Sequence, residues 1–250
     1  MIRRSILLAP AVLSAAIGAA ACGSGTTATT SSATTAATPT HRAQPVSASA
    51  PPAAPGGGGA GAGGSSATHT AVGAYTLSAG SATFTARTFR ASGTDESGVL
   101  VKGTTAKLSL IQPVIRTSGN TKSSDESSFY GLNAGALASG GARLSITGGS
   151  VSTTGSGANG VFAYGSGSAA TLSGVKITAT GAGGHGVMAS GGAAMRVSHL
   201  TVSTSGASSA AVATDRGGGT IVMNGGTFRT SGFKSPGIYS TGRSPSPAQP

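Results

Sequence analysis

All five carboxylate side chains of this 250-residue chain lie in three short stretches, Asp95-Glu96, Asp125-Glu126 and Asp215. The two pairs occur in the similar segments TDESG and SDESS, which predicts the same turn in successive structural repeats. Stacked carboxylates can bind Ca²⁺, which takes about six to eight oxygen ligands, or act as a general acid and a general base. They can equally be solvated turn residues, and the sequence leaves these interpretations open.

Asp215 runs directly into Arg216 and three glycines, in the stretch AVATDRGGGTIVMNGG. A phosphate-binding loop needs the pattern G-x-x-x-x-G-K-[ST] followed by a helix, and here both the lysine and the helix are missing. We therefore predict a turn between two strands, in which Asp215 caps backbone groups or pairs with Arg216. The alternative is a ligand or substrate site, for which the catalytic candidates are Asp215, Arg216, Asp125 and Glu126.

The remaining polar and aromatic candidates are sparse. The four histidines have no zinc-like spacing, and no nucleophile-elbow motif marks a Ser-His-Asp site; they are His41, His69, His185 and His199. We predict no cofactor, apart from the possible Ca²⁺ at the paired carboxylates. Phe129 and Tyr130 are expected to pack an insertion against the rest of the fold, or to join Tyr164 and Tyr239 in a sugar-contacting patch.

The N-terminal segment has the features of an export signal. Two arginines precede an apolar stretch and then small residues, in MIRRSILLAPAVLSAAIGAAACGSG, and the apolar stretch is too short for a membrane-spanning helix. Residues 1–21 are therefore predicted to be a signal peptide. Cys22 is the sole cysteine, so no internal disulfide can form.

The residues before Cys22 resemble the lipobox of bacterial lipoproteins, in which the cysteine is lipidated and becomes the mature N-terminus. That family usually has leucine three residues before the cysteine, where this chain has Ala19. The resemblance implies a membrane anchor at Cys22, whereas Ala19-Ala20-Ala21 equally suits an ordinary signal peptidase and free secretion. Residues 22–70 are rich in Thr, Ser, Ala, Pro and Gly without apolar periodicity, which predicts a disordered linker.

The net charge of +11 results from a shortage of acidic residues, because 16 lysines and arginines face 5 aspartates and glutamates. The basic residues are scattered singly and are not interleaved with aromatic residues, so nucleic acid is not predicted as a partner. A diffuse positive charge instead favours attraction to anionic cell-wall polymers, lipid headgroups or polysaccharide.

A repeat of about 26 residues runs through the rest of the chain, with one insertion of about 10 residues. Its markers are glycines in T-x-G or A-x-G segments: Gly93, Gly119, Gly155, Gly181, Gly206 and Gly232. The residues four, nine and eleven positions before each marker are all apolar, and apolar positions two residues apart indicate strands. Short strands that return to the same column in every repeat predict a parallel β-solenoid of about six coils over residues 71–242.

Several segments carry a family resemblance: SSDESSFYGLNAGALASGG, GANGVFAYGSG, SSAAVATDRGGGTI and SPGIYSTG. They resemble exported bacterial β-helix proteins of the pectate-lyase-like superfamily that are described as adhesin-like and have no established activity. The resemblance implies an all-β, right-handed parallel β-helix. Such proteins continue with further coils after the last of these segments, whereas here a tail is expected at 243–250, which leaves an uncapped C-terminal coil that invites self-association.

Three functional hypotheses follow. The leading one is an exported surface protein, anchored through a lipid, whose β-helix binds polysaccharide of the envelope or the extracellular space, or a surface protein. The second is a lyase or hydrolase of acidic polysaccharide, because enzymes on this fold use clustered aspartates; no such cluster matches here, and fold analogy alone does not confer function. The third is a truncated structural fragment.

Overall fold

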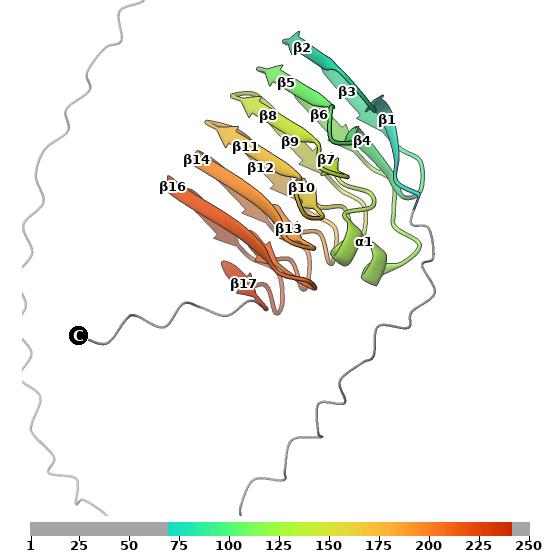
Figure 1. The fold of residues 1–250 in the computed structure, drawn as a ribbon. Coiled ribbons are helices and arrows are strands. Elements are labelled where there is room, and N and C mark those ends of the chain that lie inside the picture. Colours follow the sequence, from blue (N-terminus) through green and yellow to red (C-terminus); the bar gives the residue numbers. More distant parts are fainter. Residues whose placement is uncertain (1–69, 242–250) are drawn as a thin grey trace, which may run out of the picture. The chain divides into compact units, whose positions relative to one another are not determined.

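The coils of this chain contain two or three strands each, separated by glycine-rich turns. The computed structural model describes residues 70–241, which form a parallel β-solenoid of about six turns with a repeat of about 26 residues (Figure 1). The predicted all-β parallel solenoid is therefore confirmed. Residues 1–69 and 242–250 lie outside the described part, and with them the predicted signal peptide, the linker, the tail and Cys22.

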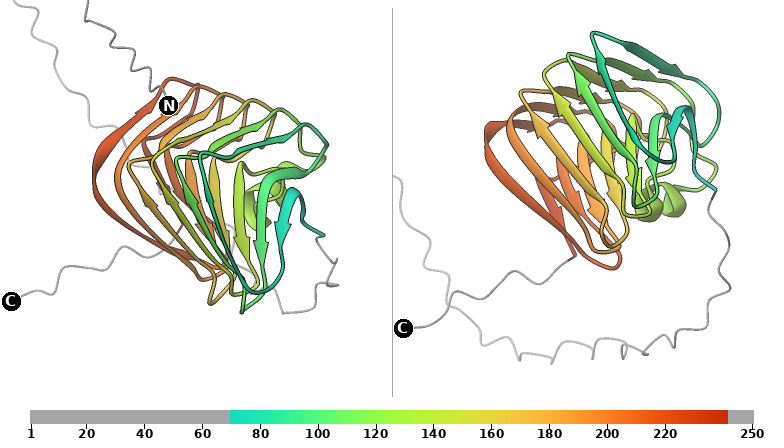
Figure 2. Two further views of the ribbon diagram at one scale, coloured as in Figure 1. Left: turned by 90° about the horizontal axis from the view of Figure 1, so that it is seen from above. Right: turned by 45° about the horizontal axis from the view of Figure 1, so that its top comes forward.

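The strands assemble into two sheets in which neighbouring coils pair in parallel (Figure 2). The 7-stranded sheet contains β1 (Val72–Leu77), β4 (Glu96–Lys102), β7 (Ala136–Ser139), β10 (Val161–Tyr164), β13 (Val187–Ser190), β15 (Val212–Thr214) and β17 (Ile238–Ser240). The larger sheet has two arms. One arm contains β2 (Ser81–Thr85), β5 (Lys107–Ile111), β8 (Arg143–Thr147) and β11 (Ala169–Ser173). The other contains β3 (Thr88–Ala91), β6 (Val114–Thr117), β9 (Ser150–Thr153) and β12 (Lys176–Ala179). Strands β14 (Ala193–Thr204) and β16 (Gly219–Thr230) have 12 residues each and extend across both arms.

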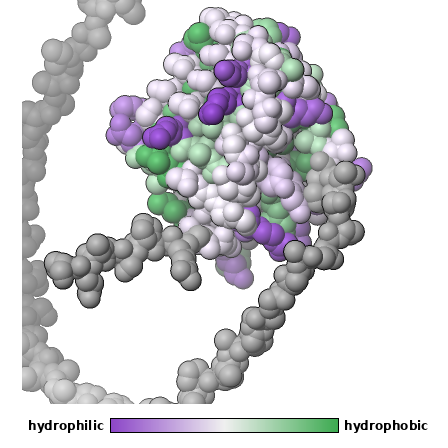
Figure 3. Space-filling view, viewed as in Figure 1, coloured by the Kyte–Doolittle hydropathy of each residue, from purple (hydrophilic) through white to green (hydrophobic). Residues whose placement is uncertain are grey.

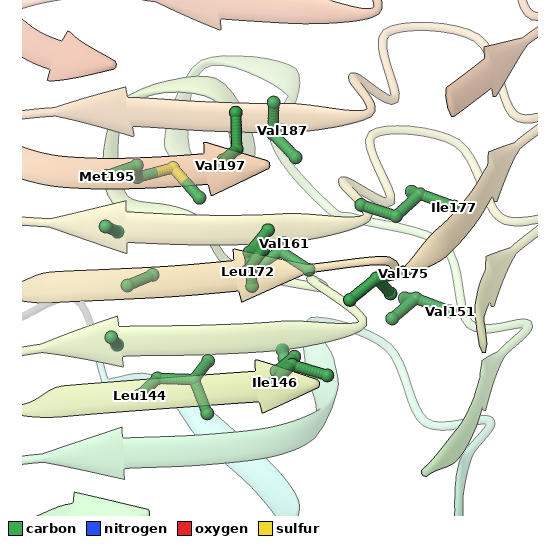
Figure 4. Packing of buried hydrophobic residues seen from close by; sticks show 14 of the residues in the cluster. Leu144, Ile146, Val151, Val161, Leu172, Val175, Ile177, Val187, Met195 and Val197 are labelled. Carbon is green, nitrogen blue, oxygen red and sulfur yellow. The ribbon is translucent and has the colours of Figure 1, made fainter. Parts of the chain in front are cut away.

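The core consists of inward-facing apolar columns that follow the predicted repeat. Along one column, Leu110 pairs in register with Ile146, Ile146 with Leu172, and Leu172 with Val197. These side chains are at most 3% exposed, and Figure 4 shows Ile146, Leu172 and Val197 stacked coil above coil, with Val151 and Ile177 of the other arm beside them. Each coil thus removes its apolar side chains from water only by stacking on its neighbours, so the stability of the rod depends on the contacts between coils.

The marker glycines allow the backbones of successive coils to come into contact. A Cβ atom added to Gly119, Gly155 or Gly181 would lie 1.8 to 1.9 Å from the carbonyl oxygen of the marker glycine one coil earlier. For Gly206 and Gly232 the corresponding distance from the added Cβ atom to the carbonyl oxygen is at most 2.0 Å. No side chain fits at these positions, which explains why the repeat is marked by glycine.

The first coil closes its end of the core with aromatic side chains. The Tyr75 and Phe84 rings meet edge to face with centroids 5.3 Å apart, and the Phe89 ring lies 5.6 Å from that of Tyr75. The Arg87 guanidinium lies 4.2 Å from the Phe84 ring centroid, within the range of a cation–π contact. At the other end of the described rod, the inward positions Met223 and Ile238 are 40% and 61% exposed. The predicted self-association at this edge stays a prediction.

We expect Gly155→Ala to destabilise the protein strongly, by about 3 kcal/mol or more, because the new methyl group would overlap the Gly119 carbonyl oxygen and separate two coils. The φ angle of Gly155 lies outside the left-handed region, so the effect isolates this steric contact. Equilibrium urea unfolding measures it. Gly237→Ala is the matched control, because a Cβ there meets nothing within 4 Å and Ala211 occupies the equivalent position one coil earlier. An equal loss of stability in both variants would contradict the explanation.

Candidate functional site

The Asp215-Arg216 stretch forms the predicted turn, between β15 and β16. One Asp215 carboxylate oxygen, Oδ1, accepts the main-chain N–H of Arg216 at 2.7 Å, so the predicted capping of backbone groups is confirmed. The Arg216 guanidinium carbon lies 3.9 Å from the centroid of the Phe129 ring. The arginine thus stabilises the fold through a cation–π contact.

The Phe129 ring belongs to α1 (Ser124–Tyr130), a short helix formed by the insertion. The helix contacts three successive coils, each of them at the end of its strand in the 7-stranded sheet. Tyr130 packs edge to face on Tyr164 at 5.3 Å, the Ser190 hydroxyl donates to the Phe129 carbonyl at 2.6 Å, and Arg216 covers the Phe129 ring. The expectation that Phe129 and Tyr130 pack the insertion against the rod is therefore confirmed. Burial, with a smaller contribution from Tyr130, raises the pKa of Tyr164 above its ordinary value.

The sequence analysis did not predict α1, although the chain contains a signal for it. Ser123 is the N-cap, and its side chain accepts the main-chain N–H of Glu126. The spacing Ser-x-x-Glu is that of a capping box at a helix N-terminus, and Gly131 ends the helix in the left-handed conformation with φ 75°. Asp125 and Glu126 lie in the first helical turn, where negative charge is favourable.

The prediction that TDESG and SDESS form equivalent turns is wrong. Asp95 lies in a turn before β4, opposite Thr121 and Lys122 of the next coil, because its Oδ1 accepts the Thr121 hydroxyl at 2.8 Å and the Lys122 main-chain N–H at 2.9 Å. The Glu126 segment is displaced along the chain by the insertion and is helical. Residues of the same type in the two segments therefore occupy different positions in the structural repeat.

The first carboxylate pair is engaged with protein donors. Besides the two bonds to Asp95, the Glu96 carboxylate accepts the main-chain N–H groups of Ser92 and Gly93, at 3.3 and 2.9 Å. Across residues 70–241, no three histidine, cysteine or acidic side chains gather as a metal site would require. The Ca²⁺ site suggested at Asp95, Glu96, Asp125 and Glu126 has no cluster of carboxylates to support it in this part of the chain.

Two arginines stand side by side on the outer face of the second arm. Arg90 of β3 and Arg116 of β6 are partners in the parallel register, and neighbouring strands lie about 4.8 Å apart. They line a groove of about 630 Å³ together with Glu96, Ser118, Ser152 and Thr154, among others. Neither arginine forms an ion pair with another described residue. We call this feature the arginine groove.

A second, smaller groove of about 400 Å³ crosses the outer face of the first arm. Lys107 of β5 and Arg143 of β8 are register partners in it, and hydroxyl-bearing residues such as Ser109, Ser145 and Thr171 line the rest. On the face that Figure 3 shows, strongly hydrophilic residues form a few small groups among weakly polar and hydrophobic ones.

A third cavity, of about 300 Å³, lies near the last described coils and collects four titratable side chains: His185, Asp215, Lys234 and Tyr239. We call it the His185 cavity. The imidazole is only 8% exposed, and its Nδ1 accepts the main-chain N–H of Ala210 at 2.9 Å. Because Nδ1 is an acceptor, the neutral ring carries its proton on Nε2. Nε2 therefore cannot act as a general base for the nearby Ser208 hydroxyl.

Sequence reasoning identified Asp215 but missed His185, Lys234 and Tyr239 as its neighbours. The available signal was the repeat itself, since His185, Ala210 and Pro236 occupy one register position just before β13, β15 and β17. Asn159 has the equivalent role in the preceding coil of this column, because its Oδ1 accepts the main-chain N–H of His185 at 2.9 Å.

We expect the protein to lose stability in mild acid because of His185. Burial lowers the pKa of its imidazole below the ordinary value, and the negative charge of Asp215 opposes part of the shift; Lys234 and Tyr239 line the same cavity. The unfolded histidine, with a pKa of about 6.5, then binds more protons than the folded one below that pH. The free energy of unfolding therefore has its full value above about pH 6.5 and decreases as the pH falls below that value.

Urea unfolding at a series of pH values between about 7.5 and 5 tests this, since the interval spans the ordinary histidine pKa. His185→Asn should flatten the dependence while keeping an acceptor for the Ala210 N–H, as Asn159 does in its own coil. The control is His199→Asn, at an exposed position with φ 52° that asparagine adopts readily. If His199→Asn removed the dependence and His185→Asn left it, the assignment would be wrong.

No helix in residues 70–241 is long and apolar enough to cross a membrane. No protein-family model and no curated protein sequence matches the chain. Among solved structures, a similar chain occurs in "The cryo-EM structure of the Vag8-C1 inhibitor complex", with 21% sequence identity and a TM-score of 0.28. The similarity covers 68% of this chain and 60% of that chain. At this level the likeness carries no argument about activity or partner.

Proposed function

We propose that the protein is an exported surface protein that binds an anionic polysaccharide through the arginine groove. The observation that carries this proposal is the pair Arg90 and Arg116, which are adjacent in register and have no ion-pair partner among the described residues. Like charges on directly neighbouring strands disfavour each other. A bound anion relieves this repulsion, and the planar guanidinium group suits carboxylate, sulfate or phosphate oxygens.

The groove also contains one carboxylate, which is engaged with the main chain through one of its two oxygens. Glu96 lines the groove, but its Oε2 accepts two main-chain N–H groups. Hydroxyl groups of Ser118, Ser152 and Thr154 border the arginines, and such groups can donate to or accept from sugar hydroxyls. The combination suits a ligand that carries both acidic groups and hydroxyl groups.

The register of the second arm extends the same surface along the rod. The Arg90–Arg116 column continues through Ser152, Thr178, Ser203 and Arg229. One polar side chain per coil, about 4.8 Å from the next, presents a line of donors that an extended polymer can follow. This favours a polysaccharide over a small anion. A protein partner at the cell surface is the alternative that the experiment below distinguishes.

The double variant Arg90→Ala/Arg116→Ala should weaken binding to an acidic polysaccharide by about 10-fold or more, because hydrogen bonds to charged groups contribute about 1.5–3 kcal/mol each. Binding to alginate, heparin and hyaluronan is measured by titration calorimetry at two salt concentrations. The matched control is Lys176→Ala/Arg196→Ala, which removes two exposed cationic side chains outside the groove. Equal weakening in both double variants would mean general electrostatic attraction and would overturn the proposed site.

The same samples are examined for newly formed reducing or unsaturated chain ends. New ends that disappear in Asp215→Ala would make the protein a polysaccharide-cleaving enzyme and replace a pure binding role. Failure of all the polysaccharides to bind, together with capture of the rod by a purified surface protein, would transfer the function to protein–protein adhesion.

The proposed location rests on the N-terminal sequence. We propose that Cys22 is lipidated and anchors the protein to the membrane, with residues 23–70 as a spacer. Metabolic labelling with radioactive palmitate should label the full chain and leave Cys22→Ser unlabelled, because Cys22 is the only cysteine. An unlabelled full chain recovered from the medium would show free secretion instead.

A further inference from the structure

The His185 cavity lies at the end of the outer column of the 7-stranded sheet, where a small residue follows large ones. Leu137, Phe162 and Met188 form a second apolar cluster. The end of α1 packs on this cluster, because a Cβ at Gly131 would meet Phe162 and Leu137 within 2.8 Å. In the next coil the outward position is Ala213, and Ala210 lies before it. The hollow that forms the His185 cavity lies at this end of the column, and Ala210 and Tyr239 are among the residues that line it.

The walls of the hollow hold their polar atoms in fixed positions. The His185 ring is positioned by the Ala210 N–H bond at Nδ1, and its main-chain N–H donates to Asn159 Oδ1. Nε2–H is therefore the donor that remains for a ligand. At Asp215 the Oδ1 atom accepts the Arg216 N–H, and Oδ2 has no hydrogen-bond partner within residues 70–241, so it remains an acceptor.

Two further side chains complete the lining of the cavity. Lys234, at the left-handed φ of 53°, lines the cavity from the turn before β17, and its Nζ lies 5.3 Å from the centroid of the Phe233 ring. Tyr239, which is 43% exposed, adds an aromatic ring and a hydroxyl group from β17 itself. The negative charge of Asp215 and the positive charge of Lys234 balance, so the cavity as a whole favours neither an anion nor a cation.

We propose that the His185 cavity binds one neutral sugar residue. A neutral sugar presents neighbouring hydroxyl groups, each of which both donates and accepts. The Asp215 carboxylate accepts from them, while His185 Nε2–H, the Lys234 ammonium and the Tyr239 hydroxyl donate to them. The apolar face of a sugar ring packs on an aromatic ring such as that of Tyr239. A volume of about 300 Å³ is at the small end of ligand pockets and suits one ring.

This site is separate from the arginine groove in position and in chemistry. The cavity lies on the outer side of the 7-stranded sheet, near β15 and β17, whereas the arginine groove lies on the second arm near β3 and β6. The inference therefore goes beyond the proposed function. A ligand that carries both neutral and acidic sugars would engage both sites, but neither proposal depends on the other.

The experiment titrates the full chain with glucose, galactose, mannose and N-acetylglucosamine, and records amide chemical shifts by NMR. Glucuronate and glycine are the charged and zwitterionic comparators. We expect saturable shifts at Ala210 and Asp215 with at least one neutral sugar, and weaker or no binding of the comparators. His185→Asn should reduce the affinity about 10-fold, because it removes the Nε2–H donor. The asparagine oxygen keeps an acceptor for the Ala210 N–H, so the wall of the cavity should stay in place.

Two further variants make the assignment specific. Tyr239→Phe removes one hydroxyl group and should weaken binding without changing the pH dependence of stability. Asp125→Asn, in the first turn of α1 and outside the cavity lining, should leave affinity unchanged. Arg90→Ala/Arg116→Ala should also leave it unchanged, so that failure of the polysaccharide proposal and failure of this one give different results.

Several outcomes overturn the inference. Saturable shifts with glycine or glucuronate but with no neutral sugar would assign the cavity to a charged ligand. Neutral sugar binding that survives His185→Asn and Tyr239→Phe together would place the sugar elsewhere. The absence of any saturable shift at concentrations well above the millimolar range would show that the cavity is not a sugar site.

Discussion

Backbone contact between coils at the marker glycines is the constraint on which the rest of the structure depends. At this column each coil approaches the carbonyl oxygen of the one before it so closely that no Cβ atom fits. A coil must therefore return to the same point after one repeat, and every other position falls into register with it. The inward columns of Leu, Ile and Val form for this reason, and their stacking removes the apolar side chains from water.

The same constraint determines where extra residues can go. The insertion between Gly119 and Gly155 cannot lengthen a coil without breaking the glycine column, so it lies outside the rod. Its helix α1 then covers the outward side chains Leu137 and Phe162 and is held at its end by Ser190 and Arg216. The helix fixes itself to coils that follow it in the chain, and it ties successive coils together across their turns.

Because the coils are in register, the outward side chain at one repeat position lies next to the outward side chains at the same position in the neighbouring coils. A residue type that recurs at one repeat position becomes a continuous line of side chains, as hydroxyl groups do after Arg90 and Arg116 on the second arm. Irregularities in a column produce sites. Two arginines in succession form the proposed anion site, and the His185 cavity lies where Ala213 follows Met188 in the outer column. On this scaffold the candidate sites therefore lie where a column of similar residues is interrupted by a different one.

The sequence by itself determined the solenoid, the length of its repeat, its inward columns and the turn at Asp215. Stacked coils impose one period on the chain, and a period is visible in the order of residues. The helix α1 was also encoded locally, in Ser123, Glu126 and Gly131, but a seven-residue segment does not reveal itself against a strand pattern. The similar segments TDESG and SDESS led to a wrong prediction, because two segments of similar sequence need not occupy the same position in the repeat. Only the tertiary structure brought Arg216 onto Phe129 and placed His185, Asp215, Lys234 and Tyr239 around one cavity. Those contacts join side chains from different coils and from the insertion, and their geometry depends on side-chain size and direction, which the repeat period does not specify.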